Sequence, residues 1–191
     1  MNVYLLRYNS GQPKAQDASI QRALSLKLLD YAMKRETGAP AGRRAHTEKG
    51  KPYIRNCPVK FNISHTEGMV AVAVGKGEIG ADVEKIGEFS QRLARRVLTE
   101  KEYTRVTSSE NPAVEFYLLW TFKEAFVKFI GSGLSYPLKK ATLDEGESVL
   151  SVYPELKIVS FAEDGYAFTF IEEGGNHINF IKLDHSLFID S

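Results

Sequence analysis

The sequence has little cysteine, little net charge and no long apolar run, and each absence excludes a class of protein. The single cysteine, Cys57, rules out an internal disulfide framework and fits the reducing cytoplasm. A net charge of +1 provides no global basic field of the kind that nucleic-acid-binding proteins carry. No apolar run approaches membrane-spanning length, and the first residues break at Gly11 without a signal peptide's apolar core. We therefore expect a cytoplasmic protein that binds neither nucleic acid nor membrane.

What remains is an ordinary globular composition, with 43% hydrophobic and 26% charged residues in a chain of 191. Helical spacing of apolar residues predicts one helix between a cap at Asp17 or Ser19 and a stop at Gly38, and a second helix ending at Gly131. Thr99 and Glu102 form the sequence signature of a capping box. Period-two patterns predict strands over 1–8, 59–65, 69–75, 78–86, 156–162, 166–173 and 177–183. The fold class is therefore α+β.

The order of helix, hairpin and strand occurs twice along the chain. A fixed offset of 97 positions lays 166–181 over 69–84 and one long helix over the other. Asn179 then falls on Asp82 and Ile181 on Glu84, so the second copy has no carboxylates there. If the halves are duplicates, the chain has one acidic site, near their junction.

The stretch KGEIGADVEKIGE places Asp82 and Glu84 two positions apart on a predicted strand. Side chains alternate along a strand, so both carboxylates point to the same face and repel each other unless a positive group lies between them. An Asp-x-Glu strand is commonly only the solvated face of a hairpin. A third carboxylate would instead complete a site for Mg²⁺, which binds carboxylates and leaves positions open for water and phosphate oxygens.

The helix EFYLLWTFKEAFVKFI supplies a candidate for the third carboxylate. It is apolar almost all round, which predicts burial on most sides, yet it carries Lys123, Glu124 and Lys128. Glu124 and Lys128 are four positions apart and form either an exposed salt bridge or functional charges placed on a narrow stripe.

Donors and cations that suit phosphate precede the acidic strand. Ser64 and His65 end the stretch FNISH, and Lys49 and Lys51 flank a glycine before Pro52. Each has an ordinary alternative, because a lone histidine is commonly structural and Gly-Lys-Pro is commonly a turn.

In this order, GKP, FNISH, GADVEKI and FYLLWTFKEAFVKFIGSGLS resemble the 4′-phosphopantetheinyl transferase superfamily, in particular its larger, single-chain, surfactin-synthetase-activating type. The resemblance covers about 49–138. It implies two similar α/β halves related by pseudo-twofold symmetry, each a small antiparallel sheet packed with a long helix. The halves would be 1–95 and 96–191, in a monomer with one active site between them.

The resemblance also implies the reaction, in which the phosphopantetheine arm of coenzyme A moves to a serine of an apo carrier protein and adenosine 3′,5′-bisphosphate is released. Asp82, Glu84 and Glu124 would hold Mg²⁺ against the pyrophosphate. Glu124 would also be the base for the serine hydroxyl, and Lys128 would contact the phosphate and protonate the leaving group. The remaining positions would bind coenzyme A: Ser64 and His65 the 3′-phosphate, Lys51 the pyrophosphate, and Arg22 the nucleotide side.

Two other functions stay open at this point. One is a Mg²⁺-dependent nucleotide pyrophosphate hydrolase, and the other is a non-catalytic paralogue that only binds coenzyme A or a carrier. Carrier proteins typically offer an acidic helix beside the modified serine. The basic stretch RLARRVLTEKEYTR is therefore either a docking face for the carrier or an ordinary solvated helix, with Arg92, Arg95, Arg96 and Arg105 as its basic residues.

Overall fold

A computed structural model describes residues 1–11, 14–144, 146, 148–174 and 177–188. The fold is mixed α+β, with several small sheets and helices. The longer elements are β1 (Asn2–Arg7), α1 (Lys14–Thr37), β4 (Lys60–Thr66), β5 (Met69–Gly75), β6 (Ile79–Lys85), α4 (Pro112–Ile130), β7 (Leu156–Glu163), β8 (Tyr166–Glu173) and β9 (Asn179–Leu183). The shorter ones are β2 (Arg44–His46), β3 (Pro52–Ile54), α2 (Gln91–Val97), α3 (Glu100–Thr107), α5 (Val149–Val152) and three 3₁₀ turns, η1 (Gly133–Ser135), η2 (Leu138–Lys140) and η3 (His185–Phe188).

The two larger sheets exchange strands. One has the order β4-β5-β1-β9 and the other the order β6-β8-β7. Thus β6, which follows the β4–β5 hairpin, pairs with β8, while β9, which follows the β7–β8 hairpin, pairs with β1 in parallel. This corrects the expectation that each half would hold an antiparallel sheet of its own. The boundary between 95 and 96 stays a prediction, and both larger sheets contain strands from its two sides.

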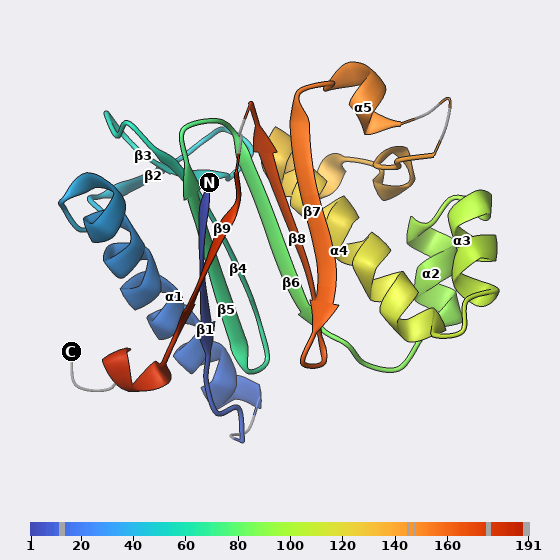
Figure 1. The fold of residues 1–191 in the computed structure, drawn as a ribbon, viewed down its shortest axis with the longest axis horizontal. Helices are drawn as coiled ribbons and strands as arrows, with labels where there is room; N and C mark the ends of the chain where they lie inside the picture. Colours follow the sequence, from blue (N-terminus) through green and yellow to red (C-terminus); the bar gives the residue numbers. More distant parts are fainter. Residues whose placement is uncertain (12–13, 145, 147, 175–176, 189–191) are drawn as a thin grey trace.

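Each sheet has a helix on its outer side, and the two inner faces share a core. Figure 1 shows α1 against the β4-β5-β1-β9 sheet and α4 against the β6-β8-β7 sheet, with α2 and α3 beyond α4. Leu28 and Leu29 of α1 are fully buried against the first sheet. Between the sheets lie small side chains such as Ala71 and Ala81 with the larger Phe168. The small residues let β5 and β6 come close together, which brings the acidic strand beside β4.

The predicted ends of the helices are largely confirmed. Gly131 ends α4 with φ +63° and Gly38 follows α1 with φ +81°, backbone that glycine adopts without steric cost. The capping box is present, with Thr99 and Glu102 each bonded to the other's backbone N–H. The first helix begins at Lys14, before the predicted caps, and the short strands β2 and β3 lie outside the ranges predicted as strands. No described helix is long and apolar enough to cross a membrane.

Candidate active site

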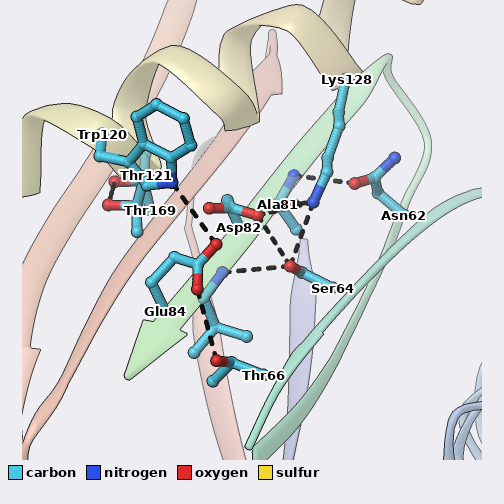
Figure 2. A network of polar contacts seen from close by, with 11 residues as sticks. Asn62, Ser64, Thr66, Ala81, Asp82, Glu84, Trp120, Thr121, Lys128 and Thr169 are labelled. Carbon is cyan, nitrogen blue, oxygen red and sulfur yellow. Dashed lines mark hydrogen bonds and ion pairs between the residues drawn. The ribbon is translucent and has the colours of Figure 1, made fainter. Parts of the chain in front are cut away.

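The edge of one large sheet meets the edge of the other through side chains rather than through a backbone ladder. Asn62, Ser64 and Thr66 lie on the same side of β4 and accept the backbone N–H groups of Ala81, Val83 and Lys85 at 3.0, 3.2 and 3.3 Å. This arrangement satisfies the free edge of β6, whose other edge pairs with β8. We call the contact between β4 and β6 the polar junction (Figure 2).

Asp82 lies at the centre of the polar junction and is 3% exposed. Its Oδ1 accepts hydrogen bonds from Ser64 Oγ at 2.8 Å and from Lys128 Nζ at 2.6 Å. Its Oδ2 is buried and has no hydrogen-bond partner in the described part of the chain. A buried carboxylate oxygen without a partner is costly, so this atom marks a place for a further cation or donor.

Glu84 follows on the same face of β6. Its two oxygens accept from Trp120 Nε1 at 3.4 Å and from Thr66 Oγ1 at 3.3 Å (Figure 2). Burial first, and the negative charge of Asp82 second, raise the pKa of Glu84 above its ordinary value. The two carboxylates therefore repel each other as the sequence predicted, and the positive group beside them in this structure is the Lys128 ammonium.

Helix α4 reaches this pair of carboxylates because it packs directly on a glycine. A Cβ added at Gly80 would lie 1.9 Å from the carbonyl oxygen of Ala125, so only glycine permits this approach of helix to strand. Trp120, Glu124 and Lys128 are four positions apart and form a half-buried stripe on α4. Burial first, and Asp82 second, raise the pKa of Glu124, while Lys128 opposes the shift.

Lys128 does not form the ordinary salt bridge within its helix. Its ammonium donates to Ser64 Oγ at 3.1 Å, to the carbonyl of Ala81 at 3.2 Å and to Asp82 at 2.6 Å. The three protons of the ammonium are thus all used across the helix–strand interface.

The three predicted metal ligands are neighbours but not a preformed cage. Among the residues described, no group of three His, Cys, Asp or Glu side chains lies close enough to hold a metal ion. Asp82 acts on the pKa of both glutamates, which places the three charges within electrostatic reach of one another. The metal site therefore stays a prediction, and Lys128 occupies one side of it.

Lys51 lies apart from this set. Its ammonium donates to Glu78 Oε2 at 3.0 Å and to the carbonyls of Ile79 and Phe129 at 3.1 and 2.8 Å. It thereby caps the last turn of α4, where a cation is favourable. A cavity of about 220 Å³ separates it from Lys128, with Lys49, Asn62 and Gly133 also in its lining.

Arg22 lines a larger cavity of about 670 Å³ between α1 and β2. Its other basic lining residues are Arg43, Arg44 and His46. His65 lies on the face of β4 opposite to Ser64, because successive strand residues alternate. Burial first, and the positive charge of Lys128 second, lower the pKa of His65, with a smaller contribution from Arg22.

Sequence reasoning missed the structural roles of three residues. Trp120 and Thr66 hold Glu84, and a periodicity argument gives neither of them a polar role. Lys123, which the sequence grouped with the charges of the helix, is fully buried and paired with Glu102 at 2.8 Å. This ion pair joins two different helices, α4 and α3, so no local sequence pattern predicts it.

A protein-family model described as 4′-phosphopantetheinyl transferase superfamily matches residues 78–171, which include β6, α4 and most of β8. Over these residues the chain is similar to this superfamily. The 4′-phosphopantetheinyl transferase gsp of Aneurinibacillus migulanus is 33% identical over 112 residues, which are 58% of this chain and 47% of that protein. The 4′-phosphopantetheinyl transferase Sfp of Bacillus subtilis (strain 168) is 39% identical over 94 residues, or 48% of this chain and 42% of that protein.

The match thus spans less than half of each of these transferases. The structure is also similar to a crystal structure of Thermotoga maritima holo-[acyl-carrier-protein] synthase. The similarity covers 52% of this chain and 64% of that one, with a TM-score of 0.43 and 18% sequence identity.

Proposed function

We propose that this protein transfers the phosphopantetheine arm of coenzyme A to a serine of an apo carrier protein. The observation that carries the proposal is the environment of Asp82. This aspartate lies within the matched region, is buried in the polar junction and keeps one oxygen without a partner beside two glutamates with raised pKa values. A purely structural aspartate in such a place would have both oxygens satisfied.

The chemistry of these residues suits a divalent cation with oxygen ligands, and the three carboxylates would have to move closer together to bind it. Asp82 Oδ2 is free to coordinate, and Glu84 and Glu124 supply two further carboxylates whose charged forms are disfavoured until a cation arrives. When bound, Mg²⁺ would neutralise charge that develops on the pyrophosphate oxygens during transfer. Mg²⁺ keeps open positions for water and phosphate, which three carboxylates from two elements would leave.

The chain's own residues account for the proton transfers. The carrier serine oxygen attacks the phosphorus that bears the pantetheine arm, and its proton passes to Glu124, directly or through water. The bond from this phosphorus to the bridging oxygen breaks, so adenosine 3′,5′-bisphosphate leaves. Lys128 stabilises the negative charge of the phosphate under attack and donates a proton to the leaving oxygen. To do so it must release Asp82, which it holds at 2.6 Å in this structure.

Coenzyme A would extend from the carboxylates to the basic cavity on α1. Arg22, Arg43, Arg44 and His46 line that cavity and suit an anionic nucleotide. His65 lies within electrostatic reach of both Arg22 and Lys128 and would bind the 3′-phosphate between them. Lys51 would contribute to the pyrophosphate side through the smaller cavity that it shares with Lys128.

The carrier would dock on α2, as the sequence suggested. Arg95 stacks on the Tyr103 ring at 4.3 Å, which leaves its guanidinium ordered at the surface, whereas Arg105 is already paired with Glu115. Arg92 and Arg96 lie on the same exposed helix. Arg95→Glu combined with Arg96→Glu should raise the KM for a carrier protein and leave coenzyme A binding unchanged, and equal kinetics would contradict this docking face.

The spans of the elements support an internal pseudo-twofold relation. An offset of 97 carries β4 onto 157–163 and β5 onto 166–172, where β7 and β8 lie. It carries α1 onto 111–134, which contains α4, and β6 onto 176–182, which overlaps β9. We take the halves 1–95 and 96–191 as the repeated units of a monomer with one active site.

Intact-mass analysis of apo carrier proteins incubated with coenzyme A and Mg²⁺ tests the activity. A gain of one phosphopantetheine mass on a serine, abolished by chelation and by Glu124→Ala, would support the transferase. Coenzyme A cleaved without any carrier would instead identify a pyrophosphate hydrolase. A folded protein that binds coenzyme A but modifies no fatty-acid, peptide or polyketide carrier would identify a binding paralogue.

A further inference from the structure

The hydroxyl of Ser64 has no hydrogen-bonding capacity left. It donates its single proton to Asp82 Oδ1 and accepts both from the N–H of Val83 and from the ammonium of Lys128. A hydroxyl has one proton and two acceptor positions, so these three bonds saturate it. The side chain is also 5% exposed. A phosphate oxygen needs a donated proton, and Ser64 has none to offer.

Thr66, two residues further along β4, has the same arrangement of hydrogen bonds. It accepts the N–H of Lys85 and donates to Glu84 Oε2, just as Ser64 accepts from Val83 and donates to Asp82. In both cases the hydroxyl bonds to the carboxylate 18 positions later and to the N–H 19 positions later. The period of two on β4 thus matches the period of two on β6 (Figure 2).

We propose that Ser64 and Thr66 are paired positioning residues, which orient Asp82 and Glu84 as cation ligands, and that Ser64 does not bind the nucleotide. Each hydroxyl is anchored by a backbone N–H, so its proton has a fixed direction. Each carboxylate is then held by one oxygen through β4, and the other oxygen is left for the cation or for a residue of α4.

This inference rests on the proposed function and reassigns Ser64, for which the family resemblance implied binding of the 3′-phosphate. It predicts that loss of either hydroxyl weakens cation binding and leaves recognition of the 3′-phosphate intact. The opposite assignment, in which Ser64 binds the 3′-phosphate, predicts the reverse. The two assignments can be separated without any turnover, because no carrier protein is needed.

The experiment measures Mn²⁺ binding by the loss of the free-ion paramagnetic resonance signal, with coenzyme A present and carrier absent. The variants are Ser64→Ala and Thr66→Val, and the matched controls are Ser64→Thr and Thr66→Ser, which keep a hydroxyl. For each protein, the affinities for coenzyme A and for 3′-dephospho-coenzyme A are compared by calorimetry, and a thermal melt checks folding.

We expect both hydroxyl-deleting variants to weaken Mn²⁺ roughly 10- to 100-fold, as loss of a group that orients a metal ligand typically does. Both controls should retain most of the affinity, and the preference for coenzyme A over its 3′-dephospho form should not change. Unchanged Mn²⁺ affinity in either variant would overturn the proposal, as would loss of that preference in Ser64→Ala.

Folding failure of one variant does not remove the test. Ser64→Ala leaves the Val83 N–H without a partner in the core, but Thr66 is only half-buried, so Thr66→Val alone still tests whether these hydroxyls position the cation ligands. Wild-type protein that binds neither Mn²⁺ nor coenzyme A would refute the proposed function. Wild-type protein that binds both, with Thr66→Val indistinguishable from it, would refute this inference only.

Discussion

Two of the places where a strand of one sheet meets a strand of the other are built from opposite chemistry. At the polar junction, Ser64 of β4 bonds to the backbone of Val83 on β6. The positions 97 residues later are Phe161 of β7 and Phe180 of β9, and there the two rings pack edge to face at 5.3 Å. We call this second contact the aromatic junction.

Under the proposed repeat, the difference between the junctions accounts for a single site. At the aromatic junction, Asn179 and Ile181 stand at the positions of Asp82 and Glu84, and the ion pair is an exposed one between Lys182 and Glu163. Strand β9 pairs on one edge with β1, and β6 pairs on one edge with β8. The other edge of β6 is satisfied by polar side chains of β4, so polar groups gather there.

The largest expected effect comes from the carboxylate that separates the two junctions. Asp82→Ala should lower kcat roughly 100- to 1,000-fold, because it removes a ligand of the cation that would neutralise the negative charge developing during transfer. Asn179→Ala, at the matching position of the aromatic junction, should leave kcat within about twofold. The measurement is single-turnover transfer to a carrier, followed by intact mass, and similar losses in both variants would contradict the distinction.

The aromatic junction should matter for stability and not for catalysis. Phe161→Ala removes its contacts with Phe168 and Phe180 and should lower the free energy of unfolding by about 2 kcal/mol, less than for a fully buried phenylalanine. Urea denaturation gives this value, and the specific activity of the folded fraction serves as the control. A loss of activity per folded molecule would mean that the aromatic junction takes part in the site.

The ion pairs at the two junctions sharpen the same contrast. Lys128 is 30% and Asp82 5% exposed, so Lys128→Met leaves a buried carboxylate without its cation and should cost about 1.5 kcal/mol of unfolding free energy. Lys182 and Glu163 are 63% and 44% exposed, so Lys182→Met should change stability by less than about 0.5 kcal/mol. Equal changes in the two urea midpoints would show that burial does not distinguish the pairs.

The smallest predicted effect is a dependence of stability on pH in metal-free protein. Folding raises the pKa of Glu84 through burial and the charge of Asp82, so the folded state carries an electrostatic cost above that raised pKa. As the pH falls from the raised pKa to the ordinary value of 4.5, the folded state takes up the proton first and the cost disappears.

Glu84→Gln should therefore raise Tm at neutral pH, and the gain should vanish as the pH falls through that window. The measurement is a series of calorimetric melts with chelator present. Glu163→Gln, at the exposed pair of the aromatic junction, is the control and should give a nearly constant difference. A gain for Glu84→Gln that grows toward acid pH would contradict the sign.

Much of the local structure could be predicted from sequence because its causes are local. The capping box of Thr99, the stop at Gly131 and the period-two strands depend on residues within a few positions of one another. The shared face of Asp82 and Glu84 follows from alternation along one strand. The proposed repeat at 97 positions likewise rests on patterns of polarity along the sequence and stays a prediction.

The rest depends on contacts between distant positions. Nothing in the strand β6 says that it pairs with β8 rather than with β5, because pairing in a sheet is decided by the packing of both faces. The role of Ser64 depends on the register of β4 against β6, which no single strand contains. Lys123 was likewise unpredictable, since its partner Glu102 lies on another helix.

Diffraction from crystals grown with Mn²⁺ and coenzyme A would test the location of the site most directly, because Mn²⁺ gives an anomalous signal. We predict one strong peak at the polar junction, within about 2.5 Å of Asp82 Oδ2 and of an oxygen of Glu84, with the Lys128 ammonium moved off Asp82 toward the pyrophosphate. A peak elsewhere, with Lys128 still bound to Asp82, would contradict the assignment of the polar junction as the active site.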